Sequence, residues 1–395
     1  MCRTRAALAL LLALLAFAAP GRAEEDEPAF RGKKLSDWLT MLREDKDAKR
    51  RRVALIAIDQ IGPAKSRKVL PAIVTALRED AEEGVREASA RALGRIITKA
   101  VAKKDDKTEE PPRLDNARDA LAAALRTDKS GRVREASATA LGYLGEEARS
   151  VVGVLALALQ DKHAGTRAAA AEALRRLGKD AREAVPELQQ ALKDKSAEPL
   201  TRAQAALALG RVGAPDALAA VPVLKEVLAD PKAPSDVRKA AAEALGELGK
   251  DAADSAPALG AALTAKTSDT LLRRAAAAAL DGLGPDAKPA LAALTLALKD
   301  DDRFVRCQAM HAIGRIGKEL APGNKEVVIG LLRCLDDSVI EVRVAAVETF
   351  GALGAEGLGP DTKAVLDRLS DASRDSNKAV REAALEALKK IKGTP

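Results

Sequence analysis

Aromatic residues are scarce in this chain of 395 residues: one Trp, one Tyr and four Phe make up 2% of it. Aromatic rings normally contribute much of the buried area of a compact core. The apolar residues are instead mainly Ala, Leu and Val, and 31% of the chain is charged. This balance favours amphipathic helices that bury narrow apolar stripes between neighbours, as in a stack of repeats.

Residues and motifs of common catalytic sites are also few. The chain has three Cys and two His, and its sequence contains no P-loop, no glycine-rich dinucleotide turn, no G-x-S-x-G and no H-E-x-x-H motif. No segment has a convincing strand pattern. We therefore expect an all-α protein that is not an enzyme and that binds no cofactor.

A long apolar run occurs only near the N-terminus. Ala6 to Ala19 follow a basic start, and Gly21-Arg22-Ala23 supplies small residues at the positions that a signal peptidase reads. The run is shorter than a membrane-spanning helix requires, which favours a secretory signal over residues 1–23 against a membrane anchor. We expect an exported protein, periplasmic or extracellular, with a short linker over residues 24–35 and no membrane span after cleavage.

An internal repeat covers residues 36–392. An apolar-Arg pair is followed by Ala-rich positions, a Leu-Gly pair and a second apolar-Gly pair, as in Val237-Arg238, Leu245-Gly246 and Leu248-Gly249. The arginines recur every 33–38 residues, except for one interval of 48. A period of this length predicts one helix pair per repeat. The repeated arginines are Arg51, Arg86, Arg134, Arg167, Arg202, Arg238, Arg273, Arg306, Arg343 and Arg381.

The long interval contains residues 98–113, which are rich in charge and include Pro111 and Pro112. Few residues in this segment are apolar, so it offers little surface to bury. The sequence predicts a flexible surface insertion here.

Each repeat is predicted to contain two helices, the second of which carries the arginine. Small residues three positions after the arginine leave room for the next helix, and a glycine eleven positions after it, such as Gly178 or Gly249, ends the helix. A proline such as Pro186 suits the first turn of the first helix. An aspartate between the helices, such as Asp161 or Asp230, is expected to cap the second helix.

This pattern resembles HEAT repeats, in particular the short Ala-rich type named for phycobilisome lyases. The segment from Gly32 to Leu39 is similar to the opening helix of exported bacterial proteins of this kind. The resemblance implies a right-handed α-solenoid of about ten helix pairs, with the first helices outside and the second helices lining a concave face. It also implies that the turn aspartates and the repeated arginines bond between adjacent repeats, which makes the arginines structural.

The second helices are predicted to expose positions 1, 5 and 9 after the arginine, away from the buried stripe. Position 9 is mostly basic, with Arg95, Arg176, Arg211, Arg315 and Lys390, whereas position 5 is more acidic. One interpretation is a basic ridge that grips an acidic partner; the other is that cations simply suit the last turn of a helix. The candidate partner-binding residues are Arg95, Tyr143, Glu172, Arg176, Arg211, Glu243, Arg315 and Glu348.

Cys307 and His311 lie four residues apart and are predicted to share one helix face. Such a pair is a weak candidate for a metal site, which needs further ligands, or for an activated thiolate. Cys334 is more simply a small core residue. A disulfide between Cys307 and Cys334 is an alternative that requires demanding geometry.

The predicted function is a protein-binding scaffold that acts as a monomer on a partner of unknown identity. One alternative is an enzyme or enzyme subunit similar to the phycobilin lyases, against which the export signal argues. Another is a HEAT-like nucleic-acid-binding protein. Signal cleavage would remove Arg3, Arg5 and Arg22 and lower the formal charge from +7 to +4, too weak an excess to indicate nucleic acid.

Overall fold

The structure is a computed structural model that describes residues 28–61, 66–102, 114–320 and 324–393. The predicted signal peptide at residues 1–23, residues 24–27 of the predicted linker, residues 103–113 of the predicted insertion and Gly62 lie outside the described residues. The chain divides into two compact units, residues 1–117 and 118–395.

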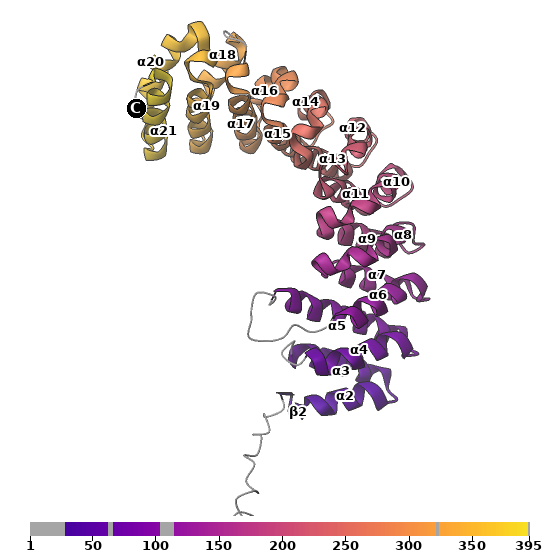
Figure 1. Cartoon of the computed structure of the whole chain (residues 1–395). Helices are drawn as coiled ribbons and strands as arrows, with labels where there is room; N and C mark the ends of the chain where they lie inside the picture. The colour runs from indigo at the N-terminus through magenta and orange to yellow at the C-terminus, as the bar shows by residue number, and fades with distance from the viewer. Residues whose placement is uncertain (1–27, 62–65, 103–113, 321–323, 394–395) are drawn as a thin grey trace, which may run out of the picture. The chain divides into compact units, whose positions relative to one another are not determined.

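The first unit contains two helix pairs and a short hairpin (Figure 1). Helices α2 and α4 pack on α3 and α5, their respective partners, and α3 packs on α5. The elements are β1 (Ala29–Phe30), β2 (Lys33–Lys34), α2 (Leu35–Glu44), α3 (Ala48–Ile61), α4 (Ser66–Glu79) and α5 (Glu83–Ala102).

The hairpin replaces part of the predicted linker over residues 24–35, and the expectation of no strands is wrong here. Ala29 pairs with Lys34 and Phe30 with Lys33 in antiparallel register. The buried Trp38 donates a hydrogen bond from its indole N–H to the Phe30 carbonyl at 3.3 Å. This tertiary bond holds two strands that are too short to be recognised from their sequence.

Helix α5 continues to Ala102, past the predicted start of the insertion at Thr98. Position 11 after Arg86 is Ile97 rather than glycine. The helix therefore lacks the residue that ends the equivalent helices, and Thr98 donates a hydrogen bond back to the Gly94 carbonyl within the same helix.

The second unit repeats the helix pair from α7 onwards, and α6 (Asp115–Thr127) spans the boundary between the units. Its first helices are α8 (Val152–Ala158), α10 (Val185–Lys193), α12 (Val221–Ala229), α14 (Ala256–Thr264), α16 (Leu291–Ala297), α18 (Lys325–Cys334) and α20 (Thr362–Ala372). Its second helices are α7 (Gly131–Leu141), α9 (Ala164–Leu177), α11 (Pro199–Val212), α13 (Ser235–Leu248), α15 (Thr270–Leu283), α17 (Arg303–Ile316), α19 (Ile340–Leu358) and α21 (Lys378–Lys392).

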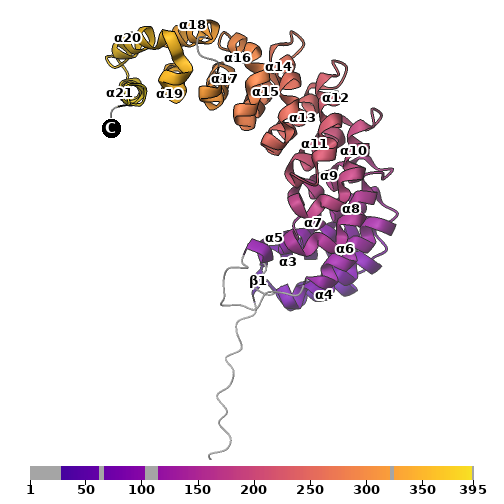
Figure 2. The same cartoon turned by 45° about the horizontal axis from the view of Figure 1, so that its top comes forward.

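Within this unit the second helices form one layer and the first helices form another (Figures 1 and 2). Each second helix packs on the second helix of the next repeat, from α7 on α9 to α19 on α21. Every repeated arginine of the sequence lies on the second helix of its own pair. The all-α solenoid that the sequence predicts is confirmed.

Glycine ends most second helices, as predicted. Gly178 and Gly249 have φ values of 53° and 59°, which residues with a Cβ atom adopt at a cost. A 3₁₀-helical segment, such as Gly178–Ala184 or Gly249–Ser255, then leads into the next first helix. Pro186, Pro222 and Pro257 occupy the first turn of α10, α12 and α14, which confirms the prediction for these prolines.

The turn aspartates do not cap the second helices, so that prediction is wrong: the capping residue follows Asp161 and Asp337 by two positions and Asp194 and Asp230 by four. The carboxylate of Asp161 accepts the backbone N–H of His163 at 2.7 Å, and His163 is the residue that caps α9. Asp337 accepts the N–H of Val339 at 2.9 Å in the same way. Each of these two aspartates thus closes the turn before the helix, and both of its oxygens also accept from another donor.

That donor is the arginine of the preceding repeat. Arg134 binds both carboxylate oxygens of Asp161 at 2.7 Å and the carbonyl of Asp128, in its own turn, at 2.8 Å. We call this two-sided contact the arginine clasp. The clasps, with nitrogen–oxygen distances of 2.5–3.1 Å, are Arg51–Asp80, Arg134–Asp161, Arg167–Glu198, Arg273–Asp300, Arg306–Asp337 and Arg343–Asp375.

The prediction that the arginines bond between repeats holds for these six but not for Arg202 and Arg238. Both side chains are buried, yet each donates to a carbonyl of its own repeat, of Leu192 and Leu228 respectively, at 3.0 Å. Among the described residues neither forms an ion pair. Arg86 and Arg381 donate to the carbonyls of Asp80 and Asp375 in their own turns, at 2.9 and 2.8 Å.

Candidate partner-binding surface

The candidate residues of the second unit lie on or just after its second helices, and α15 carries none of them. Tyr143 lies two residues after the end of α7, Glu172 and Arg176 lie on α9, Arg211 lies on α11, and Glu243 lies on α13. Arg315 and Glu348 continue the row on α17 and α19. We call these seven residues the second-helix stripe. The periodicity of the sequence therefore places them on one face, as predicted.

The stripe is densely ion-paired around α9. Glu172 accepts hydrogen bonds from Arg175 at 2.7 Å and from Arg176 at 2.9 Å. Burial opposes the charged form of Glu172, but these two guanidinium groups outweigh burial and lower its pKa below the usual value. The Arg176 guanidinium also lies 4.3 Å from the centroid of the Tyr143 ring, which links α9 to the end of α7.

Ion pairs continue on α11 and α13. Arg211 lies 3.4 Å from Glu247, and Lys239 lies 3.1 Å from Glu243. Burial raises the pKa of Glu247 above its usual value, and the nearby Arg211 only partly offsets it. Positive and negative groups therefore alternate along this face.

The predicted basic ridge is paired rather than free. Arg315 lies 2.8 Å from Asp281 of the preceding repeat, and Lys390 lies 3.8 Å from Glu386. In the first unit, Arg95 lies 2.8 Å from the buried carboxylate of Asp59. The basic residues at position 9 thus form ion pairs with carboxylates, in addition to lying near the C-terminal ends of their own helices.

Several partners in these pairs were missed by the sequence analysis: Asp59, Arg175, Glu247 and Asp281. Asp59, Arg175 and Asp281 occupy position 8 after the arginine, where most repeats carry glycine. A charged residue at a glycine position was the available signal. The sequence does not show which oppositely charged residue such a side chain contacts, because that contact forms only when adjacent repeats pack.

A pocket of about 270 Å³ opens on the stripe between α15, α17 and α19. His311, Arg315 and Glu348 line it together with Asp281, Gly314, Thr349 and Ala352. The small Gly314 and Ala352 leave the space, and the hydroxyl of the buried Thr349 is already used, because it donates to the carbonyls of Met310 and Ala345. Two candidate residues and His311 thus meet at one hollow.

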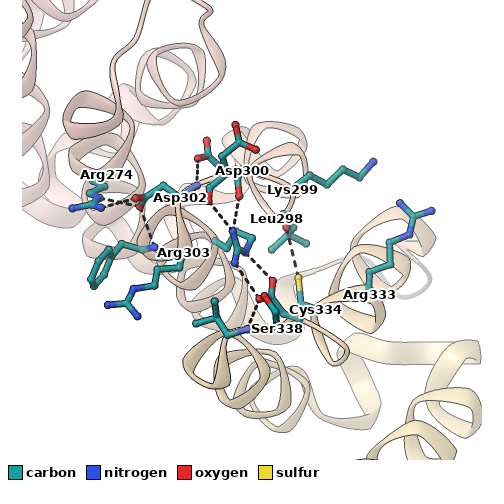
Figure 3. Close-up of a pocket in the computed structure, with 14 residues that line it drawn as sticks. Arg274, Leu298, Lys299, Asp300, Asp302, Arg303, Arg333, Cys334 and Ser338 are labelled. Atoms are coloured by element: carbon teal, nitrogen blue, oxygen red, sulfur yellow. Dashed lines mark hydrogen bonds and ion pairs between the residues drawn. The ribbon is translucent and has the colours of Figure 1, made fainter.

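Cys307 and His311 both lie on α17, but the structure gives them no further chemistry. Burial raises the pKa of the Cys307 thiol, which opposes formation of a thiolate. In the described part of the chain, no three His, Cys, Asp or Glu side chains gather as a metal site. Cys307 and Cys334 are free thiols. The buried Cys334 sulfur contacts the Leu298 carbonyl at 3.7 Å, and burial raises its pKa to about 11 (Figure 3).

The sequence of the chain matches the family of HEAT repeats over residues 35–105, 118–198, 154–232, 185–281 and 256–351. The chain belongs to the HEAT-repeat family. A search of curated proteins gave no match. Across the described residues, no helix combines the length and the apolar character that crossing a bilayer requires.

Solved structures of similar fold include importin beta and the proteins Kap95p and Kap121p. Importin beta, crystallised in an ammonium sulfate condition, is 16% identical, has a TM-score of 0.64, and matches 91% of this chain with 51% of its own. Kap95p, from a study of its binding to RanGDP, is 20% identical, with a TM-score of 0.57 and coverages of 90% and 50%. Kap121p bound to the SUMO protease Ulp1p is 18% identical, with a TM-score of 0.51 and coverages of 90% and 41%.

This HEAT-repeat chain therefore spans about half the length of the solved structures it matches, or less. At these identities the likeness concerns the fold, and the sites of those proteins do not transfer to this chain.

Proposed function

We propose that this HEAT-repeat protein is an exported scaffold that holds a protein partner on the second-helix stripe. The observation that carries the proposal is the gathering of Tyr143, Glu172, Arg176, Arg211 and Glu243 on four consecutive repeats. A solenoid keeps its fold through buried positions, so exposed positions of successive helices are free to form one extended binding surface.

The chemistry of the stripe favours a partner with charges of both signs. Its arginines are paired within the protein, so they present alternating potential rather than a uniformly basic field. Alternating charges contribute mainly to specificity and to the orientation of an encounter. Tyr143, fixed by Arg176, adds a rigid ring of the kind enriched at binding hot spots.

The solved structures of similar fold support the proposal at the level of architecture. One of them is the karyopherin Kap121p bound to a protein, the SUMO protease Ulp1p, and its fold is similar to that of this chain. We further propose that the protein is of the short Ala-rich, exported bacterial type. This part of the proposal rests on the sequence pattern of the repeats and on the predicted signal over residues 1–23.

The test is affinity capture from a cell-envelope extract, followed by titration of the purified partner against the full mature chain. Replacing Arg176, Arg211 and Arg315 together by Ser removes one cation from each of three stripe ion pairs. We expect at least a tenfold loss of affinity for the partner. Unchanged affinity would remove the stripe from the interface.

A matched control removes the same number of cations from other elements. Arg149 and Arg182 lie in 3₁₀-helical segments, and Lys225 lies on the first helix α12. The triple Ser variant of these residues should bind the partner as the unmodified chain does. A coloured ligand or co-purifying nucleic acid, in place of a protein, would instead support the enzyme or nucleic-acid alternatives.

Export has its own test. Fractionation of the source cells, with N-terminal sequencing of the recovered protein, should place it outside the cytoplasm with Glu24 as its first residue. A cytoplasmic chain that retains residues 1–23 would contradict this part of the proposal and leave the binding surface unaffected.

A further inference from the structure

Three large apolar side chains are exposed at the beginnings of three consecutive second helices. Leu271 on α15 is 52% exposed, Phe304 on α17 is 47% exposed, and Ile340 on α19 is 41% exposed. These helices pack on one another in this order. Leu271 and Phe304 lie two residues before the repeated arginine of their helix, and Ile340 lies three residues before Arg343. The position of Phe304 holds Gly165 on α9 and Asp236 on α13, but the exposed Leu200 on α11, so the run of apolar residues on three consecutive helices is local although the apolar position is not unique.

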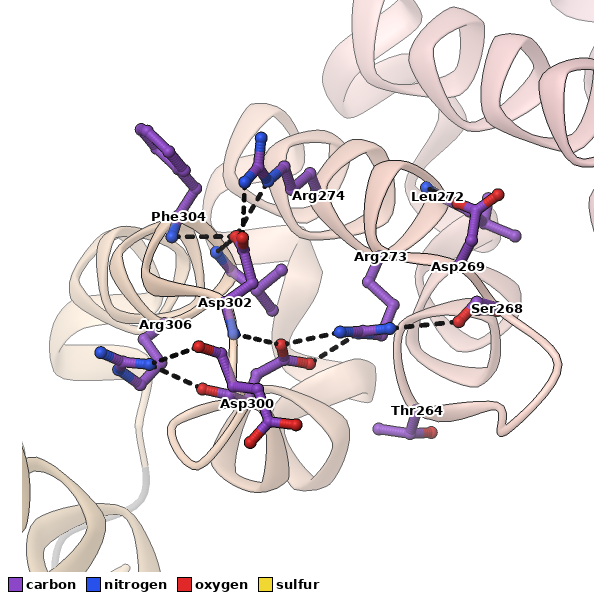
Figure 4. Close-up of polar contacts among 12 residues, drawn as sticks. Thr264, Ser268, Asp269, Leu272, Arg273, Arg274, Asp300, Asp302, Phe304 and Arg306 are labelled. Carbon is purple, nitrogen blue, oxygen red and sulfur yellow. Dashed lines mark hydrogen bonds and ion pairs between the residues drawn. The ribbon is translucent and has the colours of Figure 1, made fainter.

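Phe304 is held in place by two guanidinium groups, as Figure 4 shows for Arg274. Arg274 lies 4.5 Å and Arg303 lies 4.8 Å from the ring centroid. Arg274 is fixed in turn by Asp302, with nitrogen–oxygen distances of 2.5 and 2.9 Å. Because Leu271 lies three residues before Arg274 on one helix, the two share a face. The exposed ring is therefore preorganised and continuous with its apolar neighbour.

A pocket of about 770 Å³ adjoins this row, between the turn before α17 and the turn before α19 (Figure 3). Some of the charged side chains that line the pocket are neutralised by ion pairs and others are not. Arg274 is neutralised by Asp302, Arg306 by Asp337, and Asp300 by Arg273. Lys299 and Arg333 also line the pocket and have no carboxylate within ion-pair distance among the described residues, whereas Asp301 is the corresponding unpaired acid. A net positive potential remains.

The helix ends of this edge do not supply the positive charge, because aspartates already cap them. Asp269 accepts the N–H of Leu272 at the start of α15. Asp302 accepts those of Phe304 and Val305 at the start of α17. An acidic ligand here must therefore be met by side chains, chiefly Lys299, Arg303 and Arg333. Arg303 is only loosely held, 3.7 Å from the exposed Glu341.

The spacing of Leu271 and Phe304 favours one shape of ligand. Packed helices lie about 8–10 Å apart, so these two residues, at the same position on neighbouring helices, are separated by roughly that distance. A polyproline II segment rises about 9 Å in three residues and returns to the same face every third residue. An extended β-strand alternates faces and cannot match this repeat.

We propose that the edge formed by Leu271, Phe304 and Ile340, with Lys299, Arg303 and Arg333 beside it, binds an acidic protein segment in the polyproline II conformation. An apolar residue at every third position meets the row in turn, and carboxylates between them meet the cations. This edge is a second surface, distinct from the second-helix stripe, and its ligand is an unfolded segment rather than a folded face.

The probe is an acetylated peptide of four Leu-Glu-Pro triplets carrying a fluorophore, titrated against the full mature chain by anisotropy at low salt. We expect saturable binding with a Kd below about 1 mM. The affinity should be at least tenfold higher than for the matched Leu-Lys-Pro or Ser-Glu-Pro peptide, and it should fall as salt is added. Equal binding of all three peptides, or none, would overturn the proposal.

Variants locate the site. Phe304→Ser should weaken the Leu-Glu-Pro peptide at least tenfold, and its thermal unfolding reports whether the fold persists. The double variant Lys299→Ser/Arg333→Ser leaves the apolar row intact and should give a similar loss together with a weaker salt dependence. Unchanged binding by this double variant would contradict the assigned cations.

Two controls separate binding at this edge from binding elsewhere on the chain. Leu157→Ser removes an exposed apolar residue from α8 and should leave peptide binding unchanged. The Arg176/Arg211/Arg315 triple Ser variant of the stripe should also bind the peptide normally. Loss of peptide binding in either control, or displacement of the peptide by a single-stranded oligonucleotide at equal concentration, would overturn the proposal.

Discussion

The middle and the C-terminal repeats of the second unit are joined in different ways. Between α17, α19 and α21 the clasps Arg306–Asp337 and Arg343–Asp375 cross each boundary. Between α11, α13 and α15 no clasp forms, because Arg202 and Arg238 turn back to carbonyls of their own repeats. The turns also differ in length: Arg306 and Arg343 follow their turn aspartates by six residues, whereas Arg202 and Arg238 follow Asp194 and Asp230 by eight. Turn length alone does not decide the outcome, because the turn before α15 is equally long and Arg273 still forms a clasp with Asp300.

The same boundaries differ in how closely the backbones approach. A Cβ atom added to Gly210 or Gly246 would lie 2.8 Å from the Cα of Ala244 or Ala279, which is within overlap distance. At Gly314, between α17 and α19, the nearest atom would be 3.4 Å away, an ordinary contact. The two boundaries without a clasp are therefore joined by direct backbone contact. Directional ion pairs and close packing are not exclusive, because the boundary between α7 and α9 has both: the Arg134–Asp161 clasp, and Gly142, where an added Cβ atom would lie 2.8 Å from the Cα of Ala173. The middle boundaries have only the close packing.

Acid provides the largest expected effect, because it acts on several clasps at once. The hydrogen bond from Arg343 lowers the pKa of Asp375, and that from Arg167 lowers the pKa of Glu198. A carboxyl whose pKa is lowered in the folded state stabilises the fold above its ordinary pKa of about 4 and loses this contribution as pH falls through the folded value. Hydrogen exchange between pH 6 and pH 2.5 should show α19 and α21 opening before α13, which has no clasp to either neighbouring second helix.

In the middle repeats the shifts have both signs: the pKa values of Asp194 and Asp230 are lowered by hydrogen bonds within their turns, whereas that of Glu247 is raised. Burial raises the pKa of Glu247 on α13, so its charged form is disfavoured in the folded state and acid removes that penalty. Equal loss of protection in both regions on acidification, after correction for intrinsic exchange rates, would show that the clasps do not carry the difference.

The second-largest effect on stability is expected from removing the carboxylate of one clasp. Asp161→Ala leaves the guanidinium of Arg134, which is 5% exposed, buried without its carboxylate. We expect a loss of about 3–5 kcal/mol in the free energy of unfolding of the repeats around α7 and α9. Arg202→Met removes only one hydrogen bond and should cost about 1 kcal/mol. Urea unfolding with site-resolved hydrogen exchange measures both, with the exposed Asp301→Ala as the control.

Glycine substitutions test the close-packed boundaries. Gly246→Ala forces α13 and α15 apart and should cost about 1–3 kcal/mol. Gly314→Ala meets no overlap and gains helix propensity, so it should be neutral or stabilising by up to about 1 kcal/mol. The two changes are chemically identical. Equal effects on the urea midpoint would mean that backbone contact does not distinguish these regions.

The smallest expected effect concerns Lys195, which binds Asp230 at 3.0 Å where a clasp would otherwise reach this aspartate. Its side chain is 73% exposed, so the pair is largely solvated. Lys195→Ala should change stability by less than about 0.5 kcal/mol. A loss comparable to that of Asp161→Ala would show that this exposed pair acts as a substitute clasp.

The sequence by itself determined the repeat, its helix pairs and the face that each second helix exposes. These follow from local rules: apolar spacing sets the buried side, and glycines such as Gly178 and Gly249 end the helices. The positions of Tyr143, Glu172 and Arg176 on one surface followed from the same periodicity. The prediction that these residues contact a partner is still to be tested.

Only the tertiary structure decided which charges meet and which repeats approach. Three features show this: the pairing of Arg315 with Asp281, the clasps, and the withdrawal of Arg202 and Arg238. Each of them joins residues about 10 to 40 positions apart in the sequence. The hairpin at Phe30 and Lys33 likewise needed Trp38 to hold it. A single repeat defines its own helices, but contacts between repeats arise from the rotation and separation of neighbouring pairs, which no local pattern encodes.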